Sequence, residues 1–218
     1  MRVITVASAK GGSAKTTAVT ALAARAALES SRVAMFDLNS DQANLTQWWI
    51  LRGEPPNPVL AEVEKISTDV EVLRNEKFEW LIIDCPPLDL DIIENAVLVA
   101  DAVVIPVRTS IFDVGAITPV IEMCRDHRKP FSFLLSAVDN KMPKLTERAK
   151  AALVTEGPVF AARLSYRQDY ISALTAGKAG FEVQKDLKGE IDQLWEEVKK
   201  LAGGLAPMRK LRERAAND

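Results

Sequence analysis

Cysteine and histidine are scarce in this chain of 218 residues, which has two cysteines and one histidine. Cys85 and Cys124 are too few for a disulfide framework, and such sparing use of cysteine is typical of a protein from a reducing compartment. With His127 as the lone histidine, a His-based catalytic triad or a zinc site built around histidines is excluded. We therefore expect a cytoplasmic protein whose chemistry rests on other side chains.

Long apolar runs and an excess of charge of one sign are also absent. No apolar stretch reaches the roughly 18 residues of a membrane-spanning helix, so a membrane partner is not expected. The 28 lysines and arginines nearly balance the 30 acidic residues, for a net charge of −2. This balance excludes a bulk polycation but allows a local basic patch. Apolar residues make up 48% of the chain, which is typical of a globular protein.

Short apolar runs alternate with longer helical patterns along the chain. The runs are apolar at consecutive positions, as in strands covered on both faces, and helix-length crossovers between them indicate a parallel sheet. We predict an α/β fold, with a mostly parallel twisted sheet flanked by helices on both faces, in a single domain over residues 1–204 and a short basic tail over 205–218. The expected strands are Val3–Ala7, Arg32–Phe36, Trp80–Ile83, Ala102–Val107, Phe131–Leu135 and Val159–Ala162, and the expected helices include Thr16–Leu28, Pro58–Asn75, Ile92–Val99, Thr118–His127 and Lys188–Leu201.

A glycine-containing loop joins the first expected strand to the first expected helix. Its glycines let the backbone wrap around an anion, and N–H groups at a helix start point toward that anion. We expect this loop to bind the phosphates of ATP, with Lys15 neutralising the β- and γ-phosphates and the Thr16 hydroxyl ligating Mg²⁺. The loop reads Lys10-Gly11-Gly12-Ser13-Ala14-Lys15-Thr16-Thr17.

The loop departs from the ordinary G-x-x-x-x-G-K-T pattern because Ala9 and Ala14 stand where that pattern has glycines. It fits K-G-G-x-x-K-T-T instead, the deviant Walker A motif, and the chain resembles the small ParA-type partition ATPases of the ParA/MinD superfamily. The resemblance implies a P-loop NTPase fold and ATP hydrolysis. It also implies that Lys10 reaches the partner's nucleotide in a dimer that sandwiches ATP. Most relatives carry glycine at the position of Ala14, so we expect the alanine to affect nucleotide affinity.

Two further segments carry the resemblance. Ala34-Met35-Phe36-Asp37 is similar to the second strand of the family, which ends in a switch aspartate. Leu81-Ile82-Ile83-Asp84-Cys85-Pro86-Pro87 is similar to its Walker B strand, an apolar run that ends in an acid. An aspartate at such a strand end can hold a water bound to Mg²⁺. The resemblance therefore implies a metal set of Thr16, Asp37 and Asp84.

The stretch after the second strand departs from the family. Relatives usually read Asp-x-Asp-Pro-Gln, and the second aspartate orients or activates the attacking water. Here the sequence is Asp37-Leu38-Asn39-Ser40-Asp41-Gln42, and the Asn39 amide cannot accept a proton as a carboxylate can. Two interpretations stay open. Either hydrolysis is slow because Asn39 replaces the carboxylate, or Asp41 activates the water instead, if the loop carries one extra residue. We favour Asp41, since a mobile loop can reposition a carboxylate, and expect it to act with Lys10 and Lys15.

The resemblance implies a function as an ATP-dependent dimerising ATPase switch. Such a homodimer binds nucleoid DNA without sequence preference and releases it when a ParB-like or cargo-adaptor protein stimulates hydrolysis, so the switch partitions a plasmid or chromosome or positions a cargo. An ATP-binding scaffold with little or no hydrolysis and a MinD-like membrane-associated ATPase stay open as alternatives. Candidate contacts to DNA phosphates are Lys178, Lys185, Lys188, Lys199 and Lys200, with the basic tail as a second possibility.

Overall fold

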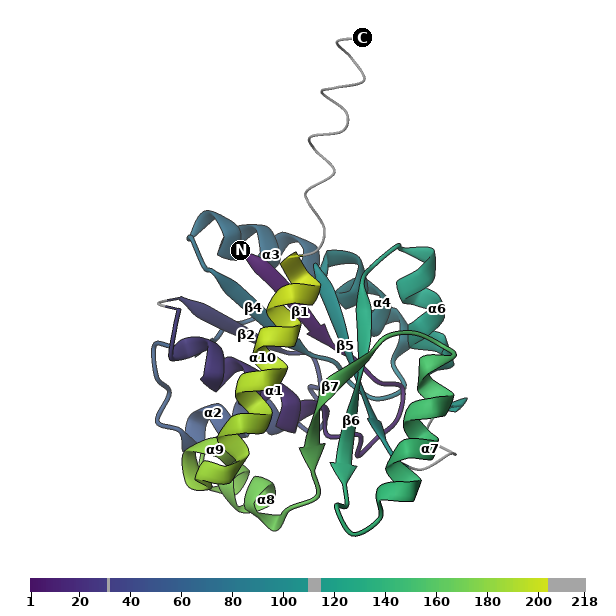
Figure 1. Cartoon of the computed structure of the whole chain (residues 1–218). Helices are drawn as coiled ribbons and strands as arrows, with labels where there is room; N and C mark the ends of the chain where they lie inside the picture. Colours follow the sequence, from purple (N-terminus) through teal and green to yellow (C-terminus); the bar gives the residue numbers. More distant parts are fainter. Residues whose placement is uncertain (31, 110–114, 204–218) are drawn as a thin grey trace.

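A parallel sheet forms the centre of the molecule (Figure 1). The computed structural model describes residues 1–30, 32–109 and 115–203, so the tail predicted over 205–218 lies outside the described residues. Within the described ranges the sheet has seven strands in the order β3-β2-β4-β1-β5-β6-β7, and all neighbours are parallel. The predicted α/β class is confirmed. The strands are β1 (Arg2–Val6), β2 (Val33–Asp37), β3 (Val59–Leu60), β4 (Trp80–Asp84), β5 (Ala102–Arg108), β6 (Phe131–Val138) and β7 (Val159–Ser165).

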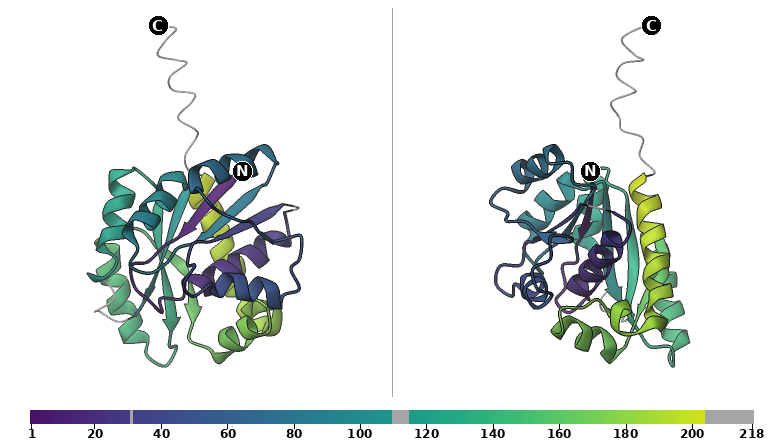
Figure 2. Two further views of the ribbon diagram at one scale, coloured as in Figure 1. Left: turned by 180° about the vertical axis from the view of Figure 1, so that it is seen from behind. Right: turned by 90° about the vertical axis from the view of Figure 1, so that its left-hand side faces the viewer.

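Helices cover both faces of this sheet (Figure 2). On one face α1 and α10 pack over side chains such as Ile4 and Ile82, and on the other α3, α4, α6 and α7 pack over their sequence neighbours Val3 and Ile83. Because both faces of the central strands are buried, these strands are apolar at consecutive positions. The helices are α1 (Lys15–Ala27), α2 (Asn44–Leu51), α3 (Ile66–Asn75), α4 (Leu90–Val99), α6 (Thr118–Asp126), α7 (Pro143–Val154), α8 (Gln168–Thr175), α9 (Gly180–Val183) and α10 (Lys188–Gly203), with a 3₁₀ turn, η1 (Lys185–Leu187).

The helix expected over Pro58–Asn75 is wrong in its first half. Its second and third residues form the edge strand β3, which pairs with β2, and the N–H of Ala61 donates to the Met35 carbonyl oxygen at 3.0 Å. Helix α3 begins only at Ile66, after Lys65 with an extended backbone. The open edge of β2 offers hydrogen bonds to a short extended segment, and this tertiary pairing overrides the local helical pattern.

The carboxyl ends of β1, β2 and β4 meet at one edge of the sheet. Asp37 ends β2 and Asp84 ends β4, and the two residues are direct partners in the register of these strands. Asp84 is also the register partner of Val6, the last residue of β1. Ligands of open parallel sheets bind at this edge. Among the described residues, no helix combines the length and apolar character required to cross a bilayer.

Candidate functional site

The loop between β1 and α1 leaves an open space in front of the first turn of the helix. Gly12 and Ala14 adopt left-handed φ angles of 69° and 71°, and the Ser136 hydroxyl of β6 donates to the Ser13 carbonyl oxygen at 2.9 Å. A Cβ atom added at Gly11 or Gly12 would meet no atom of the described residues within 4 Å. No side chain at the N-cap position pairs with the N–H groups of α1. These groups therefore remain available to an anion in front of the helix.

Lys15 is a buried cation whose hydrogen bonds go to uncharged groups. Its side chain folds back over the loop, and Nζ donates to the carbonyl oxygens of Ser8 at 3.3 Å and Lys10 at 3.2 Å. Burial lowers the pKa of Lys15 from its ordinary value, and the nearby Asp84 opposes this shift. A buried charge whose hydrogen bonds go only to neutral acceptors is costly. An anionic group bound in the loop would relieve this cost.

Thr16 links the loop to the end of β4. Its hydroxyl donates to Asp84 Oδ2 at 2.6 Å, and Asp84 is only 2% exposed. Burial raises the pKa of Asp84 to about 7; Asp37 adds to the rise, while the Thr16 hydrogen bond and Lys15 oppose it. The second oxygen, Oδ1, is buried and has no hydrogen-bond partner among the described residues. A hard divalent cation prefers such hydroxyl and carboxylate oxygens, so Thr16 and Asp84 fit Mg²⁺.

The carboxylate of Asp37 accepts hydrogen bonds from the loop and the helix that follow it. Its Oδ2 atom accepts from both the backbone N–H and the hydroxyl of Thr46, each at 2.9 Å, and Oδ1 accepts from the N–H of Asn39 at 3.1 Å. Asp37 thereby caps the first turn of α2, whose N-cap residue Ala43 offers no side-chain cap of its own. The role of Asp37 as a magnesium ligand stays a prediction.

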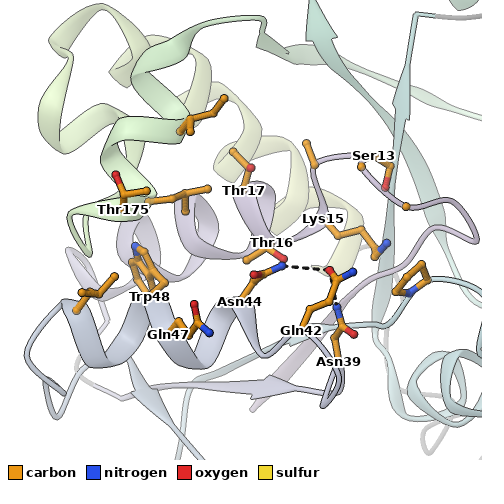
Figure 3. A pocket seen from close by; sticks show the side chains of 17 residues that line it. Ser13, Lys15, Thr16, Thr17, Asn39, Gln42, Asn44, Gln47, Trp48 and Thr175 are labelled. Atoms are coloured by element: carbon orange, nitrogen blue, oxygen red, sulfur yellow. Dashed lines mark hydrogen bonds between the residues drawn. The ribbon is translucent and has the colours of Figure 1, made fainter.

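A pocket of about 430 Å³ opens in front of this loop and runs between α2 and α8 (Figure 3). The loop forms one end, Asn39 and Gln42 form part of the side, and the far end is partly apolar. Asp41 is exposed to solvent and is not among the lining residues. Of the residues singled out from the sequence, Gly11, Gly12, Ser13, Ala14, Lys15, Thr16, Thr17 and Asn39 line the pocket, whereas Lys10, Asp37, Asp41 and Asp84 do not.

Sequence reasoning missed the far end of the pocket. The lining there comes from α2 and from α8, a helix that was not expected. Next to the far end, α2 is held by the turn that follows α8, where the Trp48 indole N–H donates to the Lys178 carbonyl oxygen at 3.0 Å. Arg52 donates two hydrogen bonds of 2.7 Å to the Glu182 carboxylate. The far-end residues are Gln47, Trp48 and Leu51 of α2 and Ile171, Leu174 and Thr175 of α8.

The lysines proposed for DNA contacts differ in their surroundings. Lys188 pairs with Asp192 at 2.6 Å, and Lys199 lies within 3.0 Å of Glu29 and 2.8 Å of Glu196. These carboxylates offset part of the positive charge. Three of the proposed lysines are exposed and form no ion pair with the described residues: Lys178, Lys185 and Lys200.

Comparison with known proteins supports the resemblance read from the motifs. Residues 4–180 match the family of CobQ/CobB/MinD/ParA nucleotide binding domains. The maintenance of carboxysome distribution protein A of Halothiobacillus neapolitanus is 27% identical over 206 residues, which cover 89% of this chain and 95% of that protein. The chromosome-partitioning ATPase Soj of Thermus thermophilus is 28% identical over 158 residues, or 59% of this chain and 63% of that protein.

Solved structures share the fold. The MinD protein in the MinC:MinD complex of Aquifex aeolicus superposes with a TM-score of 0.73 at 19% identity, over 96% of this chain and 98% of that one. A variant of McdA from Cyanothece, solved as its ATP complex, gives a TM-score of 0.70 at 18% identity, over 94% and 97% of the two chains. The single-domain architecture predicted from the sequence is thus that of MinD and McdA.

Proposed function

This chain belongs to the CobQ/CobB/MinD/ParA nucleotide-binding family, and we propose that it is an ATP-dependent dimerising ATPase switch. In this proposal the ATP-bound dimer holds nucleoid DNA and positions a plasmid, a chromosome or a protein cargo. A partner protein stimulates hydrolysis and thereby release. Support comes from the named roles of two relatives, one in carboxysome distribution and one in chromosome partitioning.

The observation that carries the proposal is the arrangement of Lys15, Thr16 and Asp84 at the start of α1. Lys15 is a buried cation for which the described residues offer no anionic hydrogen-bond partner, and it would neutralise the β- and γ-phosphates of ATP. The Thr16 hydroxyl and the unpartnered oxygen of Asp84 lie next to it and would hold Mg²⁺, which neutralises charge that develops on the phosphates.

Features beside the pocket support a second copy of the chain as partner. Pro87 lines the pocket, and the apolar side chains that follow it are exposed, Leu88 by 77% and Leu90 by 41%. Lys10 is part of the same loop as Lys15. In a dimer whose two pockets face each other, Lys10 would add positive charge where the two triphosphates meet. The exposed side chains of Leu88 and Leu90 would become buried in the interface, which favours association.

Light scattering with ATP and Mg²⁺ tests the dimer. Wild-type protein should dimerise when ATP is added. The Lys10→Ala variant should still bind ATP, as measured by calorimetry, but should stay monomeric. The Lys15→Ala variant should not bind ATP. A normal ATP-dependent dimer of Lys10→Ala would contradict the proposed sandwich.

DNA binding should depend on ATP and weaken steeply with salt, because it rests on phosphate contacts. Lys185→Glu should weaken it alike on unrelated sequences and by more than Lys188→Glu, since Asp192 already offsets the charge of Lys188. Equal DNA binding by nucleotide-free protein would contradict the switch.

A specific observation favours a second candidate, a scaffold that holds ATP without useful turnover. Asn39 stands at the position of the family's water-activating carboxylate, and none of the described residues that line the pocket is acidic. Single-turnover hydrolysis by wild-type protein, measured with and without DNA, separates the two functions: the scaffold retains ATP under both conditions.

A further inference from the structure

Three amide side chains meet at the side of the pocket next to the phosphate loop. Asn39 Nδ2 and Asn44 Nδ2 both donate to Gln42 Oε1, at 3.4 Å and 3.2 Å. All three residues line the pocket. Figure 3 shows the Gln42 amide between Asn44 and Asn39, with its nitrogen end on the Lys15 side. The two donors occupy the acceptor capacity of Oε1 and thus fix the orientation of the Gln42 amide.

This orientation leaves the Gln42 amide nitrogen as a donor and the Asn39 amide oxygen as an acceptor for a ligand. The Gln42 Nε2 hydrogens are not used by either asparagine. Asn39 donates through Nδ2, so its Oδ1 atom keeps its lone pairs. Asn39 is 9% exposed, and its backbone N–H is held by Asp37 at 3.1 Å, which anchors the residue between the end of β2 and the pocket.

We propose that Asn39 and Gln42 position the water that attacks ATP, in place of the carboxylate that relatives carry. Asn39 Oδ1 accepts a hydrogen bond from the water, and Gln42 Nε2 donates toward the oxygens of the terminal phosphoryl group. Asn44 is a positioning residue, because it acts only by holding Gln42. This inference rests on the proposed function, since it requires that the protein hydrolyses ATP.

No side chain has to take the proton in this arrangement. The water oxygen forms a bond to the γ-phosphorus while the bond from this phosphorus to the ADP oxygen breaks, and its electron pair leaves with ADP. The water proton passes to an oxygen of the transferred phosphoryl group, and the products are ADP and inorganic phosphate. The amides contribute orientation and stabilise charge in the transition state. Asp41, exposed in the same loop, is not required.

The first test is single-turnover hydrolysis at saturating ATP and Mg²⁺. Gln42→Ala and Asn39→Ala should lower the rate constant by about 10- to 100-fold, in the range for loss of one oriented contact in a transition state, with the dissociation constants for ATP and ADP changed by less than about threefold. Ser40→Ala, in the same loop but outside the pocket lining, serves as the matched control. Asn44→Ala should lower the rate by a smaller factor and add nothing in the Gln42→Ala background.

A binding measurement separates catalysis from structure. ADP with aluminium fluoride, a mimic of the transferred phosphoryl group, should bind Gln42→Ala at least about 10-fold more weakly than wild type, while ADP alone binds equally. Equal loss for both ligands would assign Gln42 a structural role and overturn the proposal.

Two other outcomes also overturn it. A wild-type rate in Gln42→Ala, or a loss of about 10²-fold or more in Asp41→Ala, would assign the water to another residue while leaving the proposed ATPase intact. Absence of hydrolysis in wild-type protein, with ATP still bound, would instead overturn the proposed ATPase together with this inference.

Discussion

The two ends of the pocket are built in different ways. The phosphate end is a single stretch from Gly11 to Thr17, whereas the far end combines α2 with α8, which lie more than 100 residues apart in the sequence. The phosphate end holds buried charge that faces neutral or missing partners. Behind the far end, outside the pocket, polar groups pair with one another, as in the Arg52–Glu182 contact. One end is arranged for a ligand, and the contacts behind the other end contribute to stability.

The largest expected effect breaks the phosphate end. Lys15→Ala should weaken ATP binding by about 100-fold or more, because hydrogen bonds to charged groups contribute about 1.5–3 kcal/mol each and the variant loses several. Calorimetry with ATP and Mg²⁺ measures this loss. Lys144→Ala, an exposed lysine of α7, is the control and should bind ATP as wild type does. Unchanged affinity of Lys15→Ala would remove the assignment of the phosphate loop.

The next largest effect disrupts the packing behind the far end, outside the pocket, and should lower the stability of the fold. Gly177 has a φ of +67°, and a Cβ atom there would lie 2.4 Å from the backbone of Leu51 and Arg52. Gly177→Ala should lower the free energy of unfolding by about 2–4 kcal/mol, from the left-handed strain and the overpacking together. Gly189→Ala, in α10 with nothing within 4 Å of the added Cβ, should be neutral or stabilising by up to about 1 kcal/mol. Urea denaturation compares the pair, and equal stabilities would contradict the close packing of α2 on the α8–α9 turn.

The motif at the phosphate end could be predicted because all its residues are neighbours in sequence. Asn39 could also be singled out, since it follows Asp37 by two positions. The far end could not, because α8 has only eight residues, too few for a clear helical period. The contact of Asn39 with Gln42 depends on the path of the loop, which is set by the bonds of Asp37 to Thr46 and by a left-handed Ala43. No local pattern encodes such a path.

A smaller loss of stability is expected when the contact between Arg52 and Glu182, behind the far end of the pocket, is removed. Arg52→Ala removes the two hydrogen bonds to Glu182, one to the Gly177 carbonyl oxygen, and the stacking of the guanidinium over Trp48. We expect a loss of about 1–2 kcal/mol, above the usual value for an exposed ion pair because the partners are only 20% and 25% exposed.

Denaturation of the double variant tests the Arg52 contact. Glu182→Ala in the Arg52→Ala background should cost less than Glu182→Ala alone. The control is Arg74→Ala, whose exposed pair with Glu71 spans 3.6 Å and should contribute less than about 0.5 kcal/mol. Additive losses at Arg52 and Glu182 would show that the pair does not couple α2 to α9.

The smallest expected effect concerns the position where the phosphate loop differs from its relatives. Ala14 is the N-cap of α1 with a φ of 71°, a conformation that costs a residue with a Cβ atom about 1–2 kcal/mol. Ala14→Gly should relieve this strain but make the unfolded chain more flexible, which costs about 0.4–1 kcal/mol. The net gain in stability should therefore be below about 1.5 kcal/mol, and the affinity for ATP should rise slightly, because the loop then reaches its binding conformation without strain. Urea denaturation and calorimetry measure both quantities on the same protein. If Ala14→Gly destabilises the fold and weakens ATP binding, the alanine is a favourable part of this loop, and the phosphate end, like the contacts behind the far end, contributes to stability as well.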